Sequence, residues 1–335
     1  MIDTLRRWRR RIRTLLNRDR PEYASTVSLI ACSILAIGSI VIGVMENSLI
    51  VQTNGYIALI DIGNSLLFLA AVERSSRSAD VTFNYGYGKY ESLAILVSAN
   101  LLVVLTIITA ADLFSAANTD TTHGSTLYLT AWSVASFVVM RGAARTLERS
   151  AERFHMPMLR YDADLWRVDS WVEIGVLAEI LLVGALAAQG YSSAVRIIEG
   201  LSAFALLAIS LKVPLTHGRE ALQQLLDRTL PDELQYSILG VISENMHRLC
   251  AFKGVHTRQS GKDIFIEIDV VMPYDYTLER LYHLERTMLD ALHETFPTAI
   301  PRVYVTPCDK SCERSGSSTC PVKAAAAGLR FGRSD

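Results

Sequence analysis

The strongest constraint on this chain of 335 residues is a set of six long apolar segments in its first two thirds. They cover residues 25–45, 48–72, 92–116, 126–146, 165–188 and 194–214. A helix needs roughly 20 apolar residues to cross the ~30 Å hydrocarbon core of a bilayer, and every segment reaches that length. The pattern therefore predicts an all-α membrane domain of six transmembrane helices over residues 24–214.

Lys and Arg are concentrated on one side of these segments. The arm formed by residues 1–23 holds eight arginines, and we expect it to touch anionic lipid headgroups. The loops after the second and fourth segments are also basic, with Arg74, Arg77, Lys89, Arg141, Arg145, Arg149, Arg153 and Arg160. The opposite loops, residues 46–47, 115–125 and 188–193, contain neither Lys nor Arg. By the positive-inside rule we expect a multi-pass integral membrane protein with both termini in the cytoplasm, in a bacterial inner membrane.

After Pro214 the composition becomes that of a soluble domain, residues 215–307. Its periodicity predicts helices over 232–247 and 277–294 and strands over 263–271 and 302–306. An α-β-β-α-β order predicts a small α+β domain with helices on one face of a sheet. The tail, residues 308–335, is rich in Ser, Gly and Ala, and we expect it to be disordered.

Two acids stand inside apolar segments, Asp61 in the second and Asp169 in the fifth. An ionisable side chain is costly in a bilayer, so it marks a pathway for ions or protons. Asn54 lies two helical turns before Asp61, and Glu173 lies one turn after Asp169, each on the same helix face. Oxygen ligands from two facing helices can replace the hydration shell of a divalent cation, and carboxylates can also accept protons. The alternative is that the acids only stabilise helix packing.

Longer motifs around these acids resemble the cation diffusion facilitators, a family of cation efflux proteins. Residues 48–61 resemble the family's second-helix motif, and residues 79–91 resemble the loop that follows it. Residues 166–169 lie where the ligand pair of helix five is expected. Residues 225–231 resemble the junction into a cytoplasmic domain, and residues 257–261 a strand–turn of that domain. The resemblance spans residues 25–307.

The resemblance implies a homodimer with a ferredoxin-like cytoplasmic domain. It also implies export of a divalent cation (Mn, Fe, Zn, Co or Mg) in exchange for protons, by alternating access around a site in mid-membrane. Asp61 and Asp169 take metal-binding positions of the family. No tightly bound cofactor is expected beside the transported cation.

The chain departs from the family where each of these acids normally has a second ligand one turn earlier. Ile57 and Leu165 occupy those positions, and neither can bind metal. The candidates to replace them are Asn54, Asp162, Asp164 and Glu173. A site of oxygen ligands without imidazole favours harder ions such as Mn²⁺, Fe²⁺ or Mg²⁺ over Zn²⁺.

Other metal positions of the family also carry different residues. The loop keeps Asp80, but Phe83 and Tyr87 replace histidines, so we expect no metal there. In the cytoplasmic domain Tyr282 and Tyr304 stand where histidines often bind zinc, so we expect dimerisation to be retained more than metal sensing.

Three of the five cysteines, Cys308, Cys312 and Cys320, lie in the tail. A cytoplasmic location favours thiols over a disulfide framework. Cys308 and Cys312 are separated by three residues and not by two, which is a poor match to a structural zinc site, although a soft metal could still bind.

These features predict a divalent cation efflux transporter in which Asp61 and Asp169 bind the ion and Asn54 and Glu173 supplement them. The missing ligands at Ile57 and Leu165 motivate an alternative, a transport-inactive relative that acts as a scaffold or heterodimer partner. An enzyme is not expected, because no nucleophile–base pair or phosphate-binding loop is present. A nucleic-acid partner is not expected either, and the net charge of −1 by itself gives no information on one.

Overall fold

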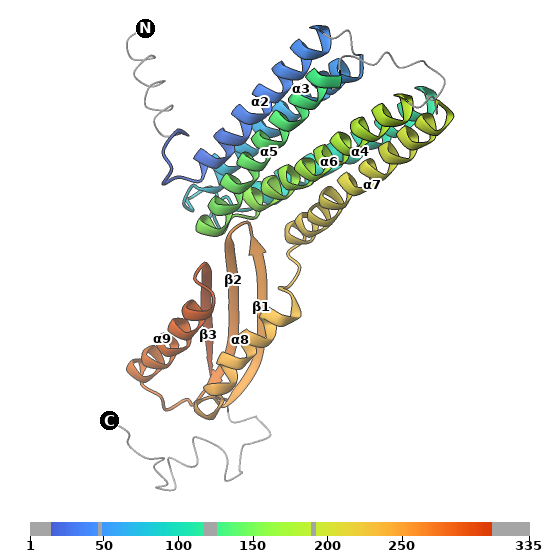
Figure 1. Cartoon of the computed structure of the whole chain (residues 1–335). Coiled ribbons are helices and arrows are strands. Elements are labelled where there is room, and N and C mark those ends of the chain that lie inside the picture. The colour runs from blue at the N-terminus through green and yellow to red at the C-terminus, as the bar shows by residue number, and fades with distance from the viewer. Residues whose placement is uncertain (1–14, 46–48, 117–125, 189–191, 310–335) are drawn as a thin grey trace, which may run out of the picture. The chain divides into compact units, whose positions relative to one another are not determined.

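The computed structural model describes residues 15–45, 49–116, 126–188 and 192–309. The chain forms two compact units, a helical unit of residues 1–225 and a C-terminal unit of residues 226–335. Most described residues are helical, and a small three-stranded sheet lies in the C-terminal unit (Figure 1).

Six long helices build the helical unit. They are α2 (Glu22–Met45), α3 (Leu49–Ser75), α4 (Lys89–Ala116), α5 (Thr126–Phe154), α6 (Pro157–Ala188) and α7 (Ser192–Leu225). The shortest, α2, has 24 residues, and at about 1.5 Å per residue it is roughly 36 Å long. Each of the six predicted apolar segments falls on one of these helices.

Among the described residues, two helical stretches are long and apolar enough by themselves to cross a membrane, Glu22–Ile42 and Lys89–Ala111. Polar and charged side chains interrupt the apolar character of other helices, such as Asp61 in α3 and Asp169 in α6. Composition alone therefore singles out fewer spans than the helix lengths would allow.

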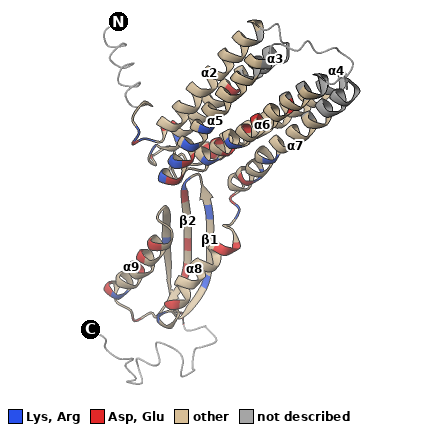
Figure 2. Cartoon of the chain, in the orientation of Figure 1, with Lys and Arg blue, Asp and Glu red and all other residues tan. Residues whose placement is uncertain are grey.

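Lys and Arg side chains gather at one end of the helical unit, here called the basic end (Figure 2). At this end α3 stops, α4 starts and α5 turns into α6. His155 makes the tight α5–α6 turn with a left-handed φ of 52°, and Pro157 follows as the first residue of α6, a position that suits proline. Arg153 of α5 forms a 2.9 Å ion pair with Asp19, which precedes α2.

The helices of this unit fall into two groups, α2, α3 and α5 in one and α4, α6 and α7 in the other (Figure 1). The groups lie together at the basic end and separate toward the opposite end (Figure 1). Within them α2 packs along α3 and α4 packs along α7, while α5 packs against α6 and so joins the groups.

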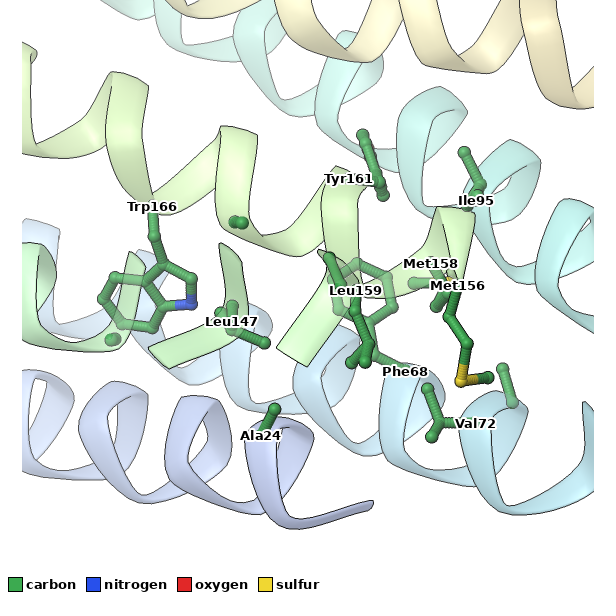
Figure 3. Close-up of a cluster of buried hydrophobic side chains, with 14 of the residues drawn as sticks. Ala24, Phe68, Val72, Ile95, Leu147, Met156, Met158, Leu159, Tyr161 and Trp166 are labelled. Carbon is green, nitrogen blue, oxygen red and sulfur yellow. The ribbon is translucent and has the colours of Figure 1, made fainter. Parts of the chain in front are cut away.

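A buried hydrophobic cluster explains why the groups meet at the basic end (Figure 3). Side chains of α2, α3, α4, α5 and α7 pack around the start of α6. Leu159 and Tyr161 of α6 are completely buried there. Phe68 of α3 meets the Tyr161 ring edge-on, with ring centres 5.8 Å apart. Leu147 of α5 is also completely buried, so both groups contribute to one core.

Helix α7 continues through Pro214 and ends only at Leu225, beyond the apolar segment that predicted it. Residues after the proline hold it against α4. Gly218 lies so close to Ala99 that a Cβ atom there would be 2.9 Å from the Ala99 Cβ. The Ser92 hydroxyl donates to Gln224 Oε1 over 2.7 Å. These contacts maintain the helix although the sequence has become polar.

The C-terminal unit contains a sheet of order β1-β2-β3. Strands β1 (Ala251–Ser260) and β2 (Asp263–Met272) form an antiparallel hairpin, and β3 (Ala299–Pro307) pairs parallel to β2. Gly261, with φ of 59°, allows the two-residue turn between Ser260 and Asp263. The alternating segment that predicted a strand thus forms the central strand β2.

Two helices complete this unit, α8 (Asp232–Glu244) and α9 (Leu278–Thr295), with a short 3₁₀ turn (Met246–Arg248) after α8. The Thr277 hydroxyl caps α9 by accepting from the backbone N–H of Arg280. The helix predicted over 277–294 is confirmed as α9, and its apolar residues Leu284, Met288 and Leu292 are buried in the core of the unit.

One close contact between α2 and α5 yields a stability prediction. A methyl group added at Gly38 would overlap the indole ring of Trp132. We expect Gly38→Ala to destabilise the protein by about 1–3 kcal/mol, because overpacking outweighs the gain of up to ~1 kcal/mol in helix propensity. Gly142→Ala on α5 is the matched control, since a Cβ atom there meets nothing within 4 Å. Thermal unfolding in detergent measures both, and an equal melting temperature for the two variants would contradict the expected clash.

Candidate cation site

Asp61 and Asp169 occupy corresponding places on their helices. Along α3, the buried residues Phe68 and Val72 lie between Asp61 and the basic end. Along α6, Leu159 and Trp166 of the same cluster lie between the basic end and Asp169. Both acids therefore lie just past the packed cluster, on the side where the helix groups separate (Figure 1).

The two carboxylates belong to one acidic region. The charges of Asp61, Asp162 and Glu173 all act on Asp169. Asp61 is partly exposed and Asp169 is exposed, and neither has a hydrogen bond or ion pair within the part of the chain that the structure describes. Nowhere in the described ranges do three His, Cys, Asp or Glu side chains converge closely enough to hold a metal ion. In this conformation the acids line a region and do not form a closed coordination shell.

The two predicted supplementary ligands differ in what can be said of them. Glu173 lies one turn beyond Asp169 and is partly buried, and Ser133 of α5 lies near its carboxylate. Asn54 lies in α3 two turns before Asp61, but its side chain is outside the described part of the structure. Their role as cation ligands stays a prediction.

Leu165, which holds the position of a family ligand on α6, packs against the buried cluster. An apolar side chain in that place cannot contact a cation and instead extends the core. The side chain of Ile57, the corresponding position on α3, lies outside the described residues. On α6, the leucine at this position therefore contributes to the hydrophobic core.

Asp162 is a further buried acid, seven residues and two turns before Asp169 on the same face of α6. Its side chain is only 3% exposed, and its Oδ1 accepts a 3.2 Å hydrogen bond from the Ser28 hydroxyl of α2. Trp166 Nε1 donates to the same Ser28 oxygen over 2.8 Å. This small network ties α2 to α6 and fixes the Asp162 carboxylate.

Cys32 is the residue near these acids that the sequence analysis missed. It is 5% exposed, is hydrogen-bonded to Ser65 of α3, and is within electrostatic range of Asp61, Asp162 and Asp169. It lies one turn after Ser28 in α2. The spacing of four residues places both small polar side chains on one helix face, and this is the sequence pattern that could have identified Cys32. Its thiol gives the acidic region one softer donor beside the oxygens.

Asp164, another candidate replacement ligand, is already engaged. His217 Nε2 lies 2.9 Å from one of its oxygens, and Arg167 forms an ion pair with the other. Both carboxylate oxygens of Asp164 therefore already have a protein partner in this structure.

The loop between α3 and α4 is held by Asp80. Its carboxylate accepts from the Tyr87 hydroxyl over 2.7 Å and from the backbone N–H groups of Phe83 and Thr82 over 2.8 Å each. The Tyr87 hydroxyl, and then the two N–H groups, lower the pKa of Asp80. The Phe83 and Tyr87 rings pack with centres 4.6 Å apart. The absence of a metal site in this loop stays a prediction.

In the C-terminal unit, the two tyrosines that the sequence analysis compared with family histidines are exposed. Tyr282 and Tyr304 are 58% and 46% exposed. Asp269, the acid retained among them, lies 3.7 Å from His256 Nε2. Cys308 is buried, and Cys312 and Cys320 lie outside the described residues.

Comparisons with known proteins identify the family of this chain. The family described as the cation efflux transmembrane domain matches residues 25–226, more than half of the chain. The chain therefore belongs to the cation efflux family, the cation diffusion facilitators, and it is an integral membrane protein of a transporter family and not an enzyme.

Curated relatives carry the name cation-efflux pump FieF. The chain is 28% identical to the one from Serratia proteamaculans over 302 residues, which cover 86% of this chain and 95% of the relative. It is 27% identical to the one from Shigella flexneri over 256 residues, which cover 75% and 81%. A solved structure described as the zinc form of CzrB is 26% identical and covers 26% of this chain and 99% of its own, with a TM-score of 0.24.

The Ser28–Asp162 contact yields a second prediction. Ser28→Ala removes the hydrogen bond to a buried carboxylate, so we expect a loss of about 1–3 kcal/mol in stability. Ser33→Ala is the matched control on α2, because the Ser33 hydroxyl donates only to Leu29 O of its own helix. We expect that variant to stay within about 0.5 kcal/mol of the parent. Thermal unfolding in one detergent compares the two variants. If Ser28→Ala is as stable as Ser33→Ala, the hydrogen bonds of Ser28 contribute nothing measurable to stability.

Proposed function

We propose that this protein exports a divalent metal cation from the cytoplasm in exchange for protons, with Asp61 and Asp169 as cation ligands. The observation that carries the proposal is the acidic region shared by α3 and α6, placed just past the packed basic end. Carboxylates in such a place need water, a cation or a proton as partner. Each of these partners has a part in cation–proton exchange.

The distribution of charge supports the orientation of this transporter. Arg and Lys lie at the basic end and on the loops there (Figure 2). The positive-inside rule assigns that end to the cytoplasm, and six spanning helices α2–α7 then leave both termini on the same side. Since the relatives above are bacterial proteins, the bacterial inner membrane is the expected location.

The packing supports alternating access. The cluster around Leu159 and Tyr161 closes the cytoplasmic end, whereas the helix groups separate toward the outer end (Figures 1 and 3). We take this conformation as the outward-facing state of the cycle, from which the cation leaves and protons bind. The inward conformation requires the cluster to part and the outer ends to approach. A homodimer through a ferredoxin-like C-terminal unit completes the proposal.

The donor set bears on which cation is transported. Oxygen donors dominate, and Leu165 supplies no imidazole, which favours Mn²⁺, Fe²⁺ or Mg²⁺ over Zn²⁺. Cys32 is a softer donor at the edge of the region.

The Cys32→Ser variant tests whether the thiol contacts the transported ion. If it does, we expect the ratio of Zn²⁺ flux to Mn²⁺ flux to fall in this variant.

Flux measurements in proteoliposomes under a pH gradient test the proposal, with Mn²⁺, Fe²⁺, Co²⁺, Zn²⁺ and Mg²⁺ tested in turn. We expect Asp61→Asn and Asp169→Asn each to lower flux of the preferred ion by about 10–100-fold, because the charge of a ligand is lost while its size is kept. Glu152→Gln, an exposed acid of α5, is the control and should keep the parent's flux.

Two outcomes would overturn this proposal. Flux of no ion at all would favour a transport-inactive scaffold or heterodimer partner. Flux that is unchanged in both aspartate variants would place the cation pathway elsewhere.

A further inference from the structure

A string of alternating charges crosses three helices at the basic end of the helical unit. It runs from Glu148 of α5 through Arg167 and Asp164 of α6 to His217 and Glu220 of α7. The string joins α5, from one helix group, to α6 and α7 of the other. It lies where the packed cluster closes this end, on the basic side of Asp169.

The distances define the string. Arg167 Nη1 lies 3.6 Å from Glu148 Oε1, and the other guanidinium nitrogen pairs with Asp164. His217 Nε2 lies 2.9 Å from Asp164 Oδ2, and His217 Nδ1 lies 3.3 Å from Glu220 Oε2. Both ring nitrogens of His217 therefore face a carboxylate oxygen. Asp164 and His217 are mostly buried, while the outer members are exposed to solvent.

A doubly protonated imidazole is the form of His217 that can donate to both carboxylates. A neutral ring has one N–H and one lone pair, so only one of its nitrogens can donate to a carboxylate. The other nitrogen would then direct its lone pair at a carboxylate oxygen. Without the charge on His217 the string holds three carboxylates and one guanidinium, and the alternation of sign is lost.

The other groups packed around His217 do not replace its charge. From α6, the Tyr161 ring centre lies 5.4 Å from the His217 ring centre, and the Arg160 charge acts on Asp164. From α4, Ala99 packs beside the neighbouring Gly218. Among the residue types of the string, histidine is the one whose charge ordinarily changes between about pH 5 and pH 8, whereas Arg and carboxylates stay ionised there.

We propose that His217 is a positioning residue of the transport cycle, which keeps the cytoplasmic end closed while it is protonated. Its imidazolium holds α7 to α6 through Asp164, and through Arg167 the same string reaches α5. Loss of the proton weakens the tie, so a rise in cytoplasmic pH favours opening toward the cytoplasm. This inference rests on the proposed orientation and function and adds a pH dependence to the inner gate.

Hydrogen–deuterium exchange of the full chain in nanodiscs tests the tie without any cation flux. The readout is the protection of amides in residues 157–167 and 213–225 between pH 5.5 and 8, corrected for intrinsic exchange rates. We expect protection to fall by about tenfold as the pH rises, which corresponds to the loss of one charge-assisted hydrogen bond. His217→Gln should have low protection at every pH, and His217→Lys should have high protection at every pH, because its charge persists.

His155→Asn is the matched control, since His155 lies at the same end of the unit and Asn tolerates its left-handed φ. This variant should keep the pH step of the parent. Protection that is independent of pH in the parent, or a pH step that survives in His217→Gln, would overturn the proposal.

Flux in proteoliposomes then separates this inference from the proposed function. If the function holds, the parent's flux should change with the pH of the cytoplasmic face and His217→Gln should flatten that profile. Asp164→Asn should flatten it as well, because it removes the other half of the tie. A pH step in exchange without flux of any ion would support the tie and reject the transporter. Flux with an unchanged pH profile in both variants would reject the tie and keep the transporter.

Discussion

A carboxylate between apolar helices has to be hydrated, neutralised or paired, because the interior of a bilayer offers it no other partner. The acids of α6 meet this requirement in different ways. Asp162 is buried and accepts from Ser28, and Asp164 is held by His217 and Arg167. Asp169 has no such partner among the described residues and lies in the same acidic region as Asp61. Of these three aspartates, Asp169 is therefore the one that we propose as a cation ligand.

The buried cluster at the basic end gives these acids their positions. It draws α2, α3, α4, α5 and α6 together and includes Ala221 of α7. Because the apolar contacts are concentrated there, the remaining lengths of the two helix groups can separate without breaking the unit (Figure 1). The two helix groups are packed together at the basic end, and Asp61 and Asp169 lie just past this packed region.

Much of this architecture could be predicted from the sequence, because long apolar segments and the stripe of α9 depend on local periodicity. The extension of α7 beyond Pro214 could not, since the contact of Gly218 with Ala99 maintains it after apolar character ends. At the candidate site, Asp61 and Asp169 stood out by their cost in a membrane. The Asp164–His217 pair joins residues 53 positions apart, a separation that no local pattern records. Cys32 looked like any other small residue of an apolar helix.

The loop between α3 and α4 has a shape that its own side chains supply. A tyrosine hydroxyl and two backbone N–H groups donate to Asp80, and two tilted aromatic rings pack beside them. If the prediction that no metal binds here holds, these contacts hold the turn at any concentration of metal in the cell. The shape of this segment would then be independent of the supply of the protein's own cargo.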